Sequence, residues 1–454
     1  MAIDFLFLYE HIVREFENDC LVMAELERRG YKSELLQLMD RKKLKYFTWK
    51  KPRVIVTSAM YNNETLNSFV YNNVGRVDKV VNLHWEEVLS REQEESEFYS
   101  LTENARKCTH ICWGNAAKQR IVAKGVPETN TEITGAVQLD FLYPEFSGYF
   151  KSREDIAIEY GLDPSSRWLA YISSFSCAFM DDKEVDELNK MTDLDFKGFK
   201  EVGGRSMNVT LDWFDRLLDE QPDIELIYRP HPCEWQSPPL DEMKKKHPNF
   251  HVITDYSVKQ WVKVCDVILT WMSTSVAEIY FAKKSCLVLR PEPLFDDYDP
   301  VTYEGVDAID SYNRLVCELA KSEHPFPIDS AQMQAHYDVD YDYPAYMRIA
   351  DLLEQTLKNP PRDKPFSEGY KPRFNFGKFV ALCGLHTMNA LHINPHWFDF
   401  VGKNITDQTE RLIGYYTKAR VSNKQIRAKM DEMRLYIDRG AHKSRNQANN
   451  KSQL

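Results

Sequence analysis

The sequence predicts two doubly wound α/β domains, each built on a parallel sheet, followed by a helical C-terminal extension. Short apolar runs alternate with amphipathic stretches of ten or more residues, which is the pattern of β-α-β units. This alternation runs twice along the chain, and a segment between residues 144 and 167 interrupts it. The length of 454 residues also exceeds what one ordinary core accommodates.

The first series of alternating elements fills about 140 residues. The apolar run at 3–9 is expected to be a strand. Apolar residues at helical spacing then predict a helix over 13–30 that stops at Gly30. Further strands are expected at 53–59, 79–85, 109–114 and 131–136, and helices at 64–75, 96–108 and 115–125. We assign residues 1–145 to an N-terminal Rossmann-like domain.

The second series follows the interruption. Strands are expected at 168–175, 224–230, 250–254, 266–271 and 285–292, and helices at 208–221, 240–248, 257–265 and 274–284. We assign residues 165–295 to a second Rossmann-like domain. Because ligands of doubly wound sheets bind beyond the carboxyl ends of the strands, we expect a site in a cleft between the two domains.

The alternation weakens after residue 295, and we assign 296–440 to a helical extension. One helix is expected over 343–359, before Pro360 and Pro361, and a long charged helix near 406–438. The polar residues 441–454 are expected to form a disordered tail.

The cysteines and the N-terminus indicate the cellular compartment. Nine cysteines are scattered without a CxxC pair, which favours a reducing compartment over a disulfide framework or a zinc site. The N-terminus lacks the features of a signal peptide, and no apolar run is long enough to span a bilayer. We therefore expect a cytoplasmic protein.

Charge is unevenly distributed along the chain. The net charge is −11, but residues 401–454 carry 12 Lys or Arg against 5 Asp or Glu. This balance argues against a nucleic-acid partner. A basic C-terminal helix on an acidic body could instead contact an anionic membrane surface, such as the inner face of the inner membrane, although a solvated helix explains the same pattern.

A strand-end motif, "IELIYRPHP", places Arg229 and His231 at the carboxyl end of a predicted strand. The prolines at 230 and 232 fix the backbone and end the strand. About forty residues later, "LTWMSTSVAE" ends a strand and opens a helix with Ser273, Thr274 and Ser275. Hydroxyls and backbone N–H groups at a helix start can bind an anion, although such residues more often serve only as a cap.

These two motifs carry a family resemblance. "YRPHPCE" and "WMSTSVAE" resemble the arginine–histidine–proline and serine-rich motifs of GT-B surface-carbohydrate glycosyltransferases, the group that includes the retaining β-Kdo transferases of capsule and lipopolysaccharide assembly. They are similar, more distantly, to motifs of polysialyltransferases and teichoic-acid glycerophosphotransferases. Further matches are "YEHIVREFENDCLVMAELERRGY" near the start, "VVNLHWEE" and "WLAYISSFS", so the resemblance covers roughly residues 3–295. In "TGAVQLDFL" the family's usual Asn-Pro is replaced by Ala-Val.

The resemblance implies a GT-B fold and transfer of a sugar from a nucleotide-activated donor. The nucleotide would bind the second domain and a glycan or glycolipid acceptor the first. Carried over onto this sequence, the donor contacts would come from Arg229, His231, Glu234, Ser273, Thr274, Ser275 and Glu278. Arg14 and Glu15, at the first strand–helix junction, would line the substrate cleft.

The chemistry requires a carboxylate, either as a base for the acceptor hydroxyl or as a nucleophile. Glu86 and Glu87 follow a strand of the first domain and are the leading candidates, although they begin an acid-rich run that is mostly surface. We expect no metal and no cofactor beyond the nucleotide-sugar substrate, because Asp297-Tyr298-Asp299 matches a metal-binding DxD pattern only loosely.

The expected function is transfer of a sugar, with Kdo or a related acidic sugar from a CMP donor as the leading candidate, onto a growing bacterial surface glycan. Three alternatives remain open. A teichoic-acid-type phosphotransferase would move an alditol phosphate from a CDP donor, and a hydrolysing sugar-nucleotide epimerase would need no acceptor. A non-catalytic partner of a polysaccharide-assembly complex would bind no nucleotide.

Overall fold

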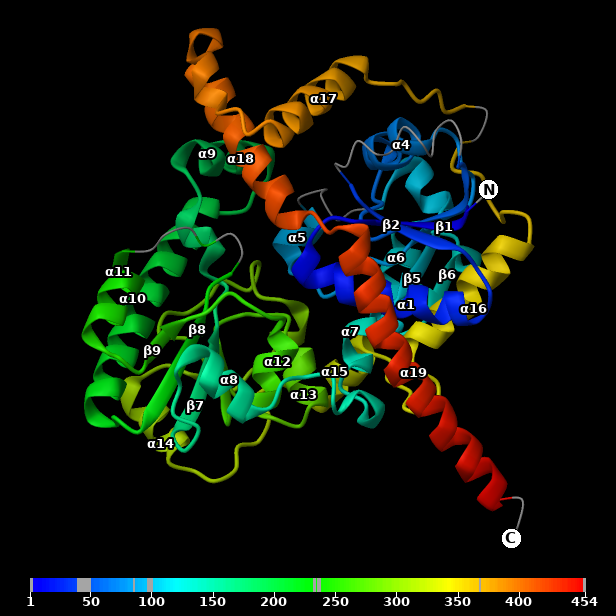
Figure 1. The fold of residues 1–454 in the computed structure, drawn as a ribbon. Coiled ribbons are helices and arrows are strands. Elements are labelled where there is room, and N and C mark those ends of the chain that lie inside the picture. Colours follow the sequence, from blue (N-terminus) through cyan, green and yellow to red (C-terminus); the bar gives the residue numbers. More distant parts are fainter. Residues whose placement is uncertain are drawn as a thin grey trace. The chain divides into compact units, whose positions relative to one another are not determined.

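A computed structural model describes residues 3–38, 50–84, 86–95, 101–231, 234, 238–366 and 369–451 (Figure 1). The chain forms two compact units. The first unit contains the residues up to 85, residues 101–137 and the chain from 340 onward, and the second contains residues 86–100 and 138–339. Each unit carries one six-stranded parallel sheet.

The sheet of the first unit has the order β2-β1-β3-β4-β5-β6. Its strands are β1 (Ile3–Tyr9), β2 (Ser33–Gln37), β3 (Pro52–Thr57), β4 (Val80–Asn82), β5 (Thr109–Cys112) and β6 (Thr131–Ile133). The main intervening helical elements are η1 (Ile12–Phe16), α1 (Glu17–Arg28), α3 (Asn63–Thr65), η3 (Leu66–Tyr71), α4 (Asn72–Val74), η4 (Glu103–Lys107) and α6 (Asn115–Ala123). Strands β1 and β3 pair in parallel with Phe5 opposite Val54, and both side chains are fully buried.

The sheet of the second unit has the order β12-β11-β10-β7-β8-β9. Its strands are β7 (Arg167–Ile172), β8 (Ile224–Arg229), β9 (Phe250–Val252), β10 (Val267–Thr270), β11 (Ser285–Leu289) and β12 (Ala308–Ile309). Its helices include α5 (Arg91–Glu95), α7 (Val137–Asp140), α8 (Arg153–Tyr160), α9 (Asp182–Met191), α10 (Phe196–Glu220), α11 (Pro238–Lys246), α12 (Val258–Val264), α13 (Val276–Phe281), α14 (Tyr312–Leu319) and α15 (Ser330–His336).

The core of the second unit shows why the sheet is doubly wound. Along β7, Leu169 and Tyr171 pack on one face with side chains of α10 and α14. Trp168 and Ala170 point to the other face and pack with side chains of α8, α12 and α13. Because side chains alternate along a strand, a fully apolar strand requires helices on both faces.

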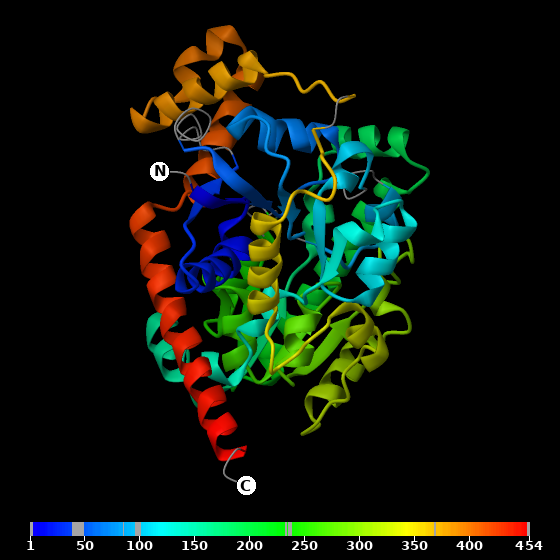
Figure 2. The ribbon, with the colours of Figure 1, turned by 90° about the vertical axis from the view of Figure 1, so that its right-hand side faces the viewer.

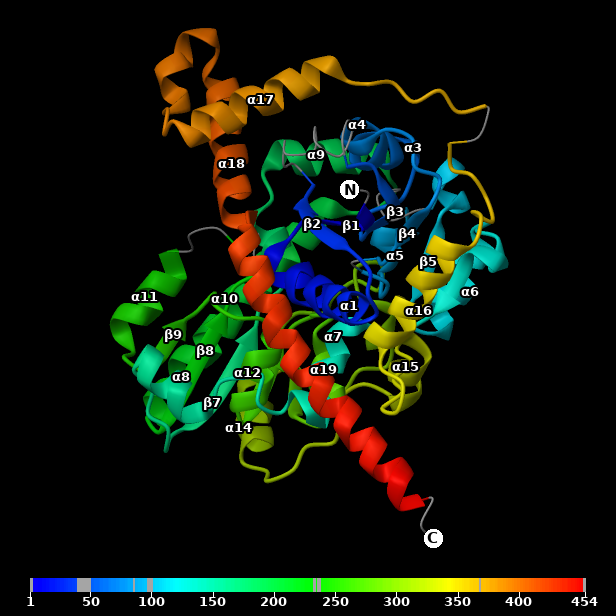
Figure 3. The same cartoon turned by 45° about the vertical axis from the view of Figure 1, so that its right-hand side comes forward.

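The C-terminal segment completes the first unit with α16 (Ala345–Lys358), α17 (Phe376–Ala390), η9 (Pro395–Val401), α18 (Lys403–Ala419) and α19 (Asn423–Lys451). Figure 2 shows α16, in yellow, beside the blue helix α1, and Figures 1 and 3 show the red helix α19 lying across α1. The Tyr9 hydroxyl donates to the Ala419 carbonyl at 2.8 Å, which ties β1 to the end of α18.

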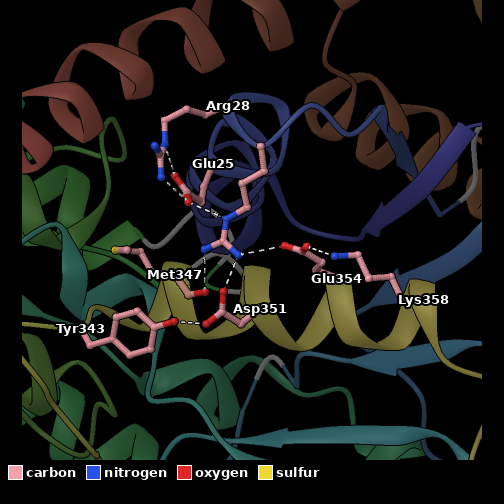
Figure 4. A network of polar contacts seen from close by, with 8 residues as sticks. Glu25, Arg28, Tyr343, Met347, Asp351, Glu354 and Lys358 are labelled. Atoms are coloured by element: carbon pink, nitrogen blue, oxygen red, sulfur yellow. Dashed lines mark hydrogen bonds and ion pairs between the residues drawn. The ribbon is translucent and has the colours of Figure 1, made fainter.

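A polar network joins α1 to α16 (Figure 4). The fully buried carboxylate of Glu25 accepts from Arg28 Nε and from Arg29 Nε, each at 2.7 Å. Arg29 also contacts Asp351 and, at 3.4 Å, Glu354 of α16. The network therefore anchors the C-terminal segment through one buried acid.

Glu25→Ala should lower the free energy of unfolding by about 3 kcal/mol, because it leaves two arginine side chains without their buried counter-ion. Urea denaturation measures this loss. The control is Arg427→Ala, which removes an exposed ion pair with Glu27 at 2.8 Å and should cost less than about 1 kcal/mol. Equal losses in the two variants would contradict the role given to Glu25.

The sequence-based boundaries differ from the structure in several places. The edge strands β2 and β12 were not predicted, because one has polar residues at both ends and the other spans two residues. The interrupting segment contains α8, which begins with a capping box at Ser152. Of the helix expected over 96–108, residues 96–100 lie outside the described residues and Glu103–Lys107 form a 3₁₀ helix.

The C-terminal helices also differ from the expectation. The long helix expected near 406–438 is two helices, α18 and α19, with a break between Ala419 and Asn423. Helix α19 continues to Lys451, where we expected a disordered tail from 441. The segment 441–451 contains neither proline nor glycine, so no residue there ends the helix.

Candidate functional site

The sheet of the second unit has one topological switch point, between β7 and β10. The chain proceeds from β7 to β8 and β9 on one side, and then crosses to β10, β11 and β12 on the other. Ligands of open α/β sheets bind at such a point, beyond the carboxyl ends of the strands. The Met272 N–H donates to Ser174 Oγ at 3.2 Å, which links the two strand ends there.

The histidine motif forms a turn at the end of β8. The Glu234 N–H donates to the His231 carbonyl at 2.8 Å and closes the turn. The carboxylate of Glu234 accepts from the Phe175 N–H at 3.0 Å, from the Tyr228 hydroxyl at 3.2 Å and from Ser173 Oγ, so it pins the turn to the end of β7. Burial raises the pKa of Glu234.

The carboxylate of Glu234 therefore points toward the end of β7, and the Glu234 N–H holds the His231 carbonyl in place. The sequence predicted Glu234 among the donor contacts, and in the structure its carboxylate accepts from the hydroxyl groups of Ser173 and Tyr228. Pro232, which was expected to end the strand together with Pro230, lies outside the described residues.

Arg229 supports a neighbouring loop. Its buried guanidinium donates to the carbonyls of Asp255 at 2.6 Å and Tyr256 at 2.7 Å, and burial lowers its pKa to about 10. These bonds hold the backbone that leads from β9 into α12. Tyr256 has a φ of 61°, a left-handed conformation that these contacts help to maintain.

The serine motif forms a turn between β10 and α13. The Ser275 N–H donates to Ser273 Oγ at 3.2 Å, and the Ser273 carbonyl accepts from the Tyr303 hydroxyl at 2.7 Å. Arg290, at the end of β11, donates to the Trp271 carbonyl at 2.8 Å and so braces the same turn. Ser273, Thr274 and Ser275 are each partly exposed.

Glu86 reaches this turn from a distant part of the sequence. Its Oε2 accepts from Thr274 Oγ1 at 3.1 Å, and its Oε1 accepts from the N–H groups of Glu87 and Val88. Residues 86–100 belong to the second compact unit, although we had assigned them to the first domain. The backbone bond from Glu92 to Asp297, at 2.7 Å, belongs to the same unit and holds this segment.

Three candidate carboxylates act electrostatically on one tyrosine, Tyr337. Burial raises the pKa of the Tyr337 hydroxyl well above its ordinary value, and the charges of Glu86, Glu278 and Glu87 add to the effect. Burial also raises the pKa of Glu278, and the charge of Lys259 opposes that rise. Of these carboxylates, Glu86 contacts the serine turn directly, and Glu278 lies on α13, the helix that follows the turn.

The remaining predicted residues, Arg14 and Glu15, lie in the first unit. They follow β1, at the switch point between β1 and β3 of that sheet. Glu15 is buried and accepts from the Glu10 N–H at 2.6 Å and from Arg14 Nε at 3.4 Å. Burial raises the pKa of Glu15, and the Arg14 charge opposes that rise.

The sequence analysis did not single out Glu10, which lies beside Arg14 and Glu15. Burial and the nearby Glu15 raise the pKa of Glu10 from 4.5 to about 7. Asp19 is also buried, and burial together with Glu15 raises its pKa well above the ordinary value. An acidic pattern after a strand could have pointed to Glu10, but only the fold shows how far it is buried.

Glu10→Gln should stabilise the protein at pH 8 by about 1–3 kcal/mol and leave its stability at about pH 4 nearly unchanged. The folded state binds the Glu10 proton more tightly than the unfolded state, because the folded pKa is raised. The contribution of the Glu10 carboxyl to the free energy of unfolding is fully present below about pH 4.5 and is lost as the pH rises through about 7. Urea denaturation at both pH values tests this, and a variant equal to the wild type at pH 8 would contradict it.

The "VVNLHWEE" stretch places a buried histidine pair at the end of β4. His84 Nε2 lies 3.1 Å from His110 Nδ1, and His110 Nε2 donates to the Ala105 carbonyl at 2.9 Å. Burial lowers the pKa of His84 well below its ordinary value and that of His110 to about 4. Both rings are therefore neutral. They contact Asn82, the last residue of β4, just before the chain reaches Glu86.

One group among the described residues has metal-ligand geometry, namely Asp215, Asp219 and His247. Lys246 Nζ forms ion pairs with Asp215 at 2.6 Å and with Asp219 at 3.0 Å, so both carboxylates are already paired with a cation of the chain. The loosely DxD-like residues are also engaged, since Asp297 pairs with Arg91 and Asp299 with Arg290.

Comparison with known proteins identifies the fold. No protein-family model and no curated protein matches the chain. It is similar to a solved putative UDP-N-acetylglucosamine 2-epimerase from Listeria monocytogenes, with a TM-score of 0.50 and 12% identity over 81% of this chain and 100% of that chain. The similarity to UDP-GlcNAc 2-epimerase from Neisseria meningitidis bound to UDP-GlcNAc has a TM-score of 0.49 and 13% identity, over 79% and 100% of the two chains.

The chain is also similar to the wall teichoic acid polymerase TagF, with a TM-score of 0.48 and 12% identity over 78% of this chain and 88% of that chain. At such identities a similarity establishes the fold and no more. Together with the two doubly wound sheets and the helical C-terminal segment, the Listeria match confirms the predicted GT-B fold class. No helix in the described ranges is long and apolar enough to cross a membrane.

Proposed function

We propose that this protein transfers a sugar from a nucleotide-activated donor to a growing bacterial surface glycan. The observation that carries the proposal is the placement of the His231 turn and the serine turn after β8 and β10, the two strands that flank β7. An imidazole after β8 and the hydroxyl groups of Ser273 and Ser275 after β10, beside the switch point between β7 and β10, are suited to a phosphate group.

The donor phosphate is held, in this proposal, by His231 and by the Ser273–Ser275 turn. In the reaction the bond between the anomeric carbon and the donor phosphate oxygen breaks, and the acceptor oxygen bonds to that carbon. Negative charge develops on the leaving nucleotide phosphate, where His231 and the hydroxyl groups stabilise it. In this proposal the chain's own donors stabilise that charge, and no metal takes part in the step.

The acceptor hydroxyl must lose its proton, and we assign this task to Glu86, with Glu87 as the alternative. Glu86 is the carboxylate that touches the serine turn, and its three hydrogen bonds fix its orientation. A positioned base of this kind accelerates a reaction by about 10²–10⁴-fold. We assign the glycan or glycolipid acceptor to the first unit, where Arg14, Glu15 and Glu10 gather at the switch point.

For the donor we propose CMP-linked Kdo or a related acidic sugar, on the resemblance of the two motifs. We place the reaction in the cytoplasm at the inner membrane face. The second candidate function is a hydrolysing sugar-nucleotide epimerase, because solved epimerases share the fold. A CDP-alditol phosphotransferase and a non-catalytic assembly partner are the remaining alternatives.

Product analysis separates these functions. The protein is incubated with CMP-Kdo, CDP-glycerol or UDP-GlcNAc, with and without a glycolipid acceptor fraction, and the products are identified by mass. Acceptor-dependent release of CMP with a Kdo-sized gain on the acceptor is the expected result. Turnover of UDP-GlcNAc without acceptor would support the epimerase, a glycerol-phosphate gain the phosphotransferase, and no turnover of any donor the non-catalytic partner.

A further inference from the structure

Thr274 differs from its neighbour Ser273 in the hydrogen bond that its hydroxyl group makes. Thr274 Oγ1 donates to Glu86 Oε2 at 3.1 Å. Ser273 Oγ instead accepts, from the Ser275 N–H at 3.2 Å. A hydroxyl group has a single proton to donate. The one proton of the Thr274 hydroxyl is therefore directed to a carboxylate of the same unit.

Glu86 is held in place independently of this contact. Its Oε1 accepts from the Glu87 N–H at 3.1 Å and from the Val88 N–H at 3.2 Å. Glu87 and Val88 are both nearly completely buried in the second unit. Because these two bonds come from the adjacent buried backbone, the carboxylate keeps its position when Oε2 exchanges its partner.

The backbone of the serine turn is braced as well. The Ser273 N–H donates to Thr270 Oγ1 at 3.3 Å, and the Ser273 carbonyl accepts from the Tyr303 hydroxyl at 2.7 Å. Thr270 is fully buried, and its hydroxyl donates to the Ile172 carbonyl at 3.0 Å. Redirecting the Thr274 proton therefore requires rotation of one hydroxyl group and no rearrangement of the turn.

A phosphate group at this turn would compete with Glu86 for the Thr274 proton. This step rests on the proposed function, which places the donor phosphate at the Ser273–Ser275 turn. The oxygens of an ionised phosphate accept hydrogen bonds, as the carboxylate oxygens of Glu86 do. Hydrogen bonds from a hydroxyl to either kind of anion are charge-assisted and of similar strength. The exchange of one anion for the other is therefore close to balanced.

We propose that Thr274 couples donor binding to the readiness of Glu86 to act as the base. The Thr274 hydroxyl turns from Glu86 Oε2 to a phosphate oxygen of the donor, and no covalent bond changes in this step. Each hydrogen bond to a carboxylate favours its charged form, so loss of one makes the group a better proton acceptor. Thr274 is thus a positioning residue that prepares the base once the donor is bound.

Coupling of this kind is reciprocal. If a bound phosphate draws the Thr274 proton away from Glu86, removal of the Glu86 carboxylate must favour phosphate binding by releasing the same proton. The reciprocal effect appears in nucleotide affinity alone. It can therefore be measured without an acceptor and without turnover.

A double-mutant cycle on nucleotide affinity tests the proposal. Dissociation constants for CMP and for UDP are measured by titration calorimetry with the wild type, Glu86→Ala, Thr274→Val and the double variant. Removing the Glu86 charge favours phosphate binding in either background, so the cycle cancels this contribution. We expect Glu86→Ala to tighten binding about fivefold more in the presence of Thr274 than in the Thr274→Val background.

Two controls accompany the cycle. Thr274→Ser keeps the hydroxyl group and should behave like the wild type. Tyr312→Phe is the matched control, because the Tyr312 hydroxyl also donates to a carboxylate of the second unit, that of Glu220, at 2.7 Å. Its removal should leave both dissociation constants unchanged.

Thermal melting verifies the folding of each variant. If Glu86→Ala does not fold, Glu86→Gln takes its place in the cycle, with an expected coupling of about two- to threefold, since a neutral acceptor holds the Thr274 proton less strongly. Additive effects at the two positions, in a wild type that binds nucleotide, would overturn this inference and leave the phosphate site intact. A wild type that binds no nucleotide would overturn the proposed function itself.

Discussion

His231→Ala should lower the rate of sugar transfer by about 100-fold or more. The imidazole follows β8, the strand beside β7, where we propose that it stabilises the charge of the leaving phosphate. Loss of one positioned donor to such a charge costs about 10²–10³ in rate. Steady-state assays with the donor identified by product analysis measure the loss.

The control for this variant is His251→Ala. His251 Nε2 lies 2.6 Å from Glu225 Oε2 in the same unit, so its removal should lower stability without removing a donor contact. Thermal melting monitors folding in both variants. Comparable transfer rates for the wild type and His231→Ala, with both proteins folded, would remove His231 from the catalytic machinery.

Glu86→Gln should lower the rate of transfer by about 10²–10⁴-fold while leaving nucleotide affinity within a few-fold. Glutamine keeps the size of the side chain and can still accept from Thr274, but it cannot take a proton from the acceptor. Measuring the rate and the nucleotide affinity separately distinguishes a base from a binding residue.

Glu87→Gln provides the comparison for Glu86. Glu87 is nearly completely buried, whereas Glu86 is partly exposed and touches the serine turn. We expect Glu87→Gln to affect stability more than rate. If Glu87→Gln abolishes transfer and Glu86→Gln does not, the two assignments must be exchanged.

Much of the fold follows from sequence periodicity. The strands at the centre of each sheet are continuous apolar runs, and the structure places β1, β3, β7, β8, β10 and β11 within a few residues of the expected ranges. The edge strand β2 was not predicted, because its only apolar residues are two leucines between polar ends. The association of residues 86–100 with the second unit depends on tertiary contacts such as that of Glu92 with Asp297, which no local pattern encodes.

The candidate site was predictable in position more than in detail. Strand-end prolines and the serine run located His231 and the Ser273–Ser275 turn, which the structure places after the strands that flank β7. The bracing roles of Arg229 and Glu234 were not predictable, because their partners are backbone groups and hydroxyls of other strands. The raised pKa of Glu10 likewise results from burial that the sequence does not reveal.

Nucleotide binding tests the central claim most directly. We would measure thermal shifts of the wild type and His231→Ala with CMP, CDP, UDP, GDP and dTDP. A ligand at about 100 times its dissociation constant adds roughly 2.7 kcal/mol of stability, which is readily observed. We expect CMP or CDP to stabilise the wild type and not His231→Ala. No shift of the wild type with any nucleotide would contradict the claim that the His231 and Ser273–Ser275 turns form a nucleotide-phosphate site.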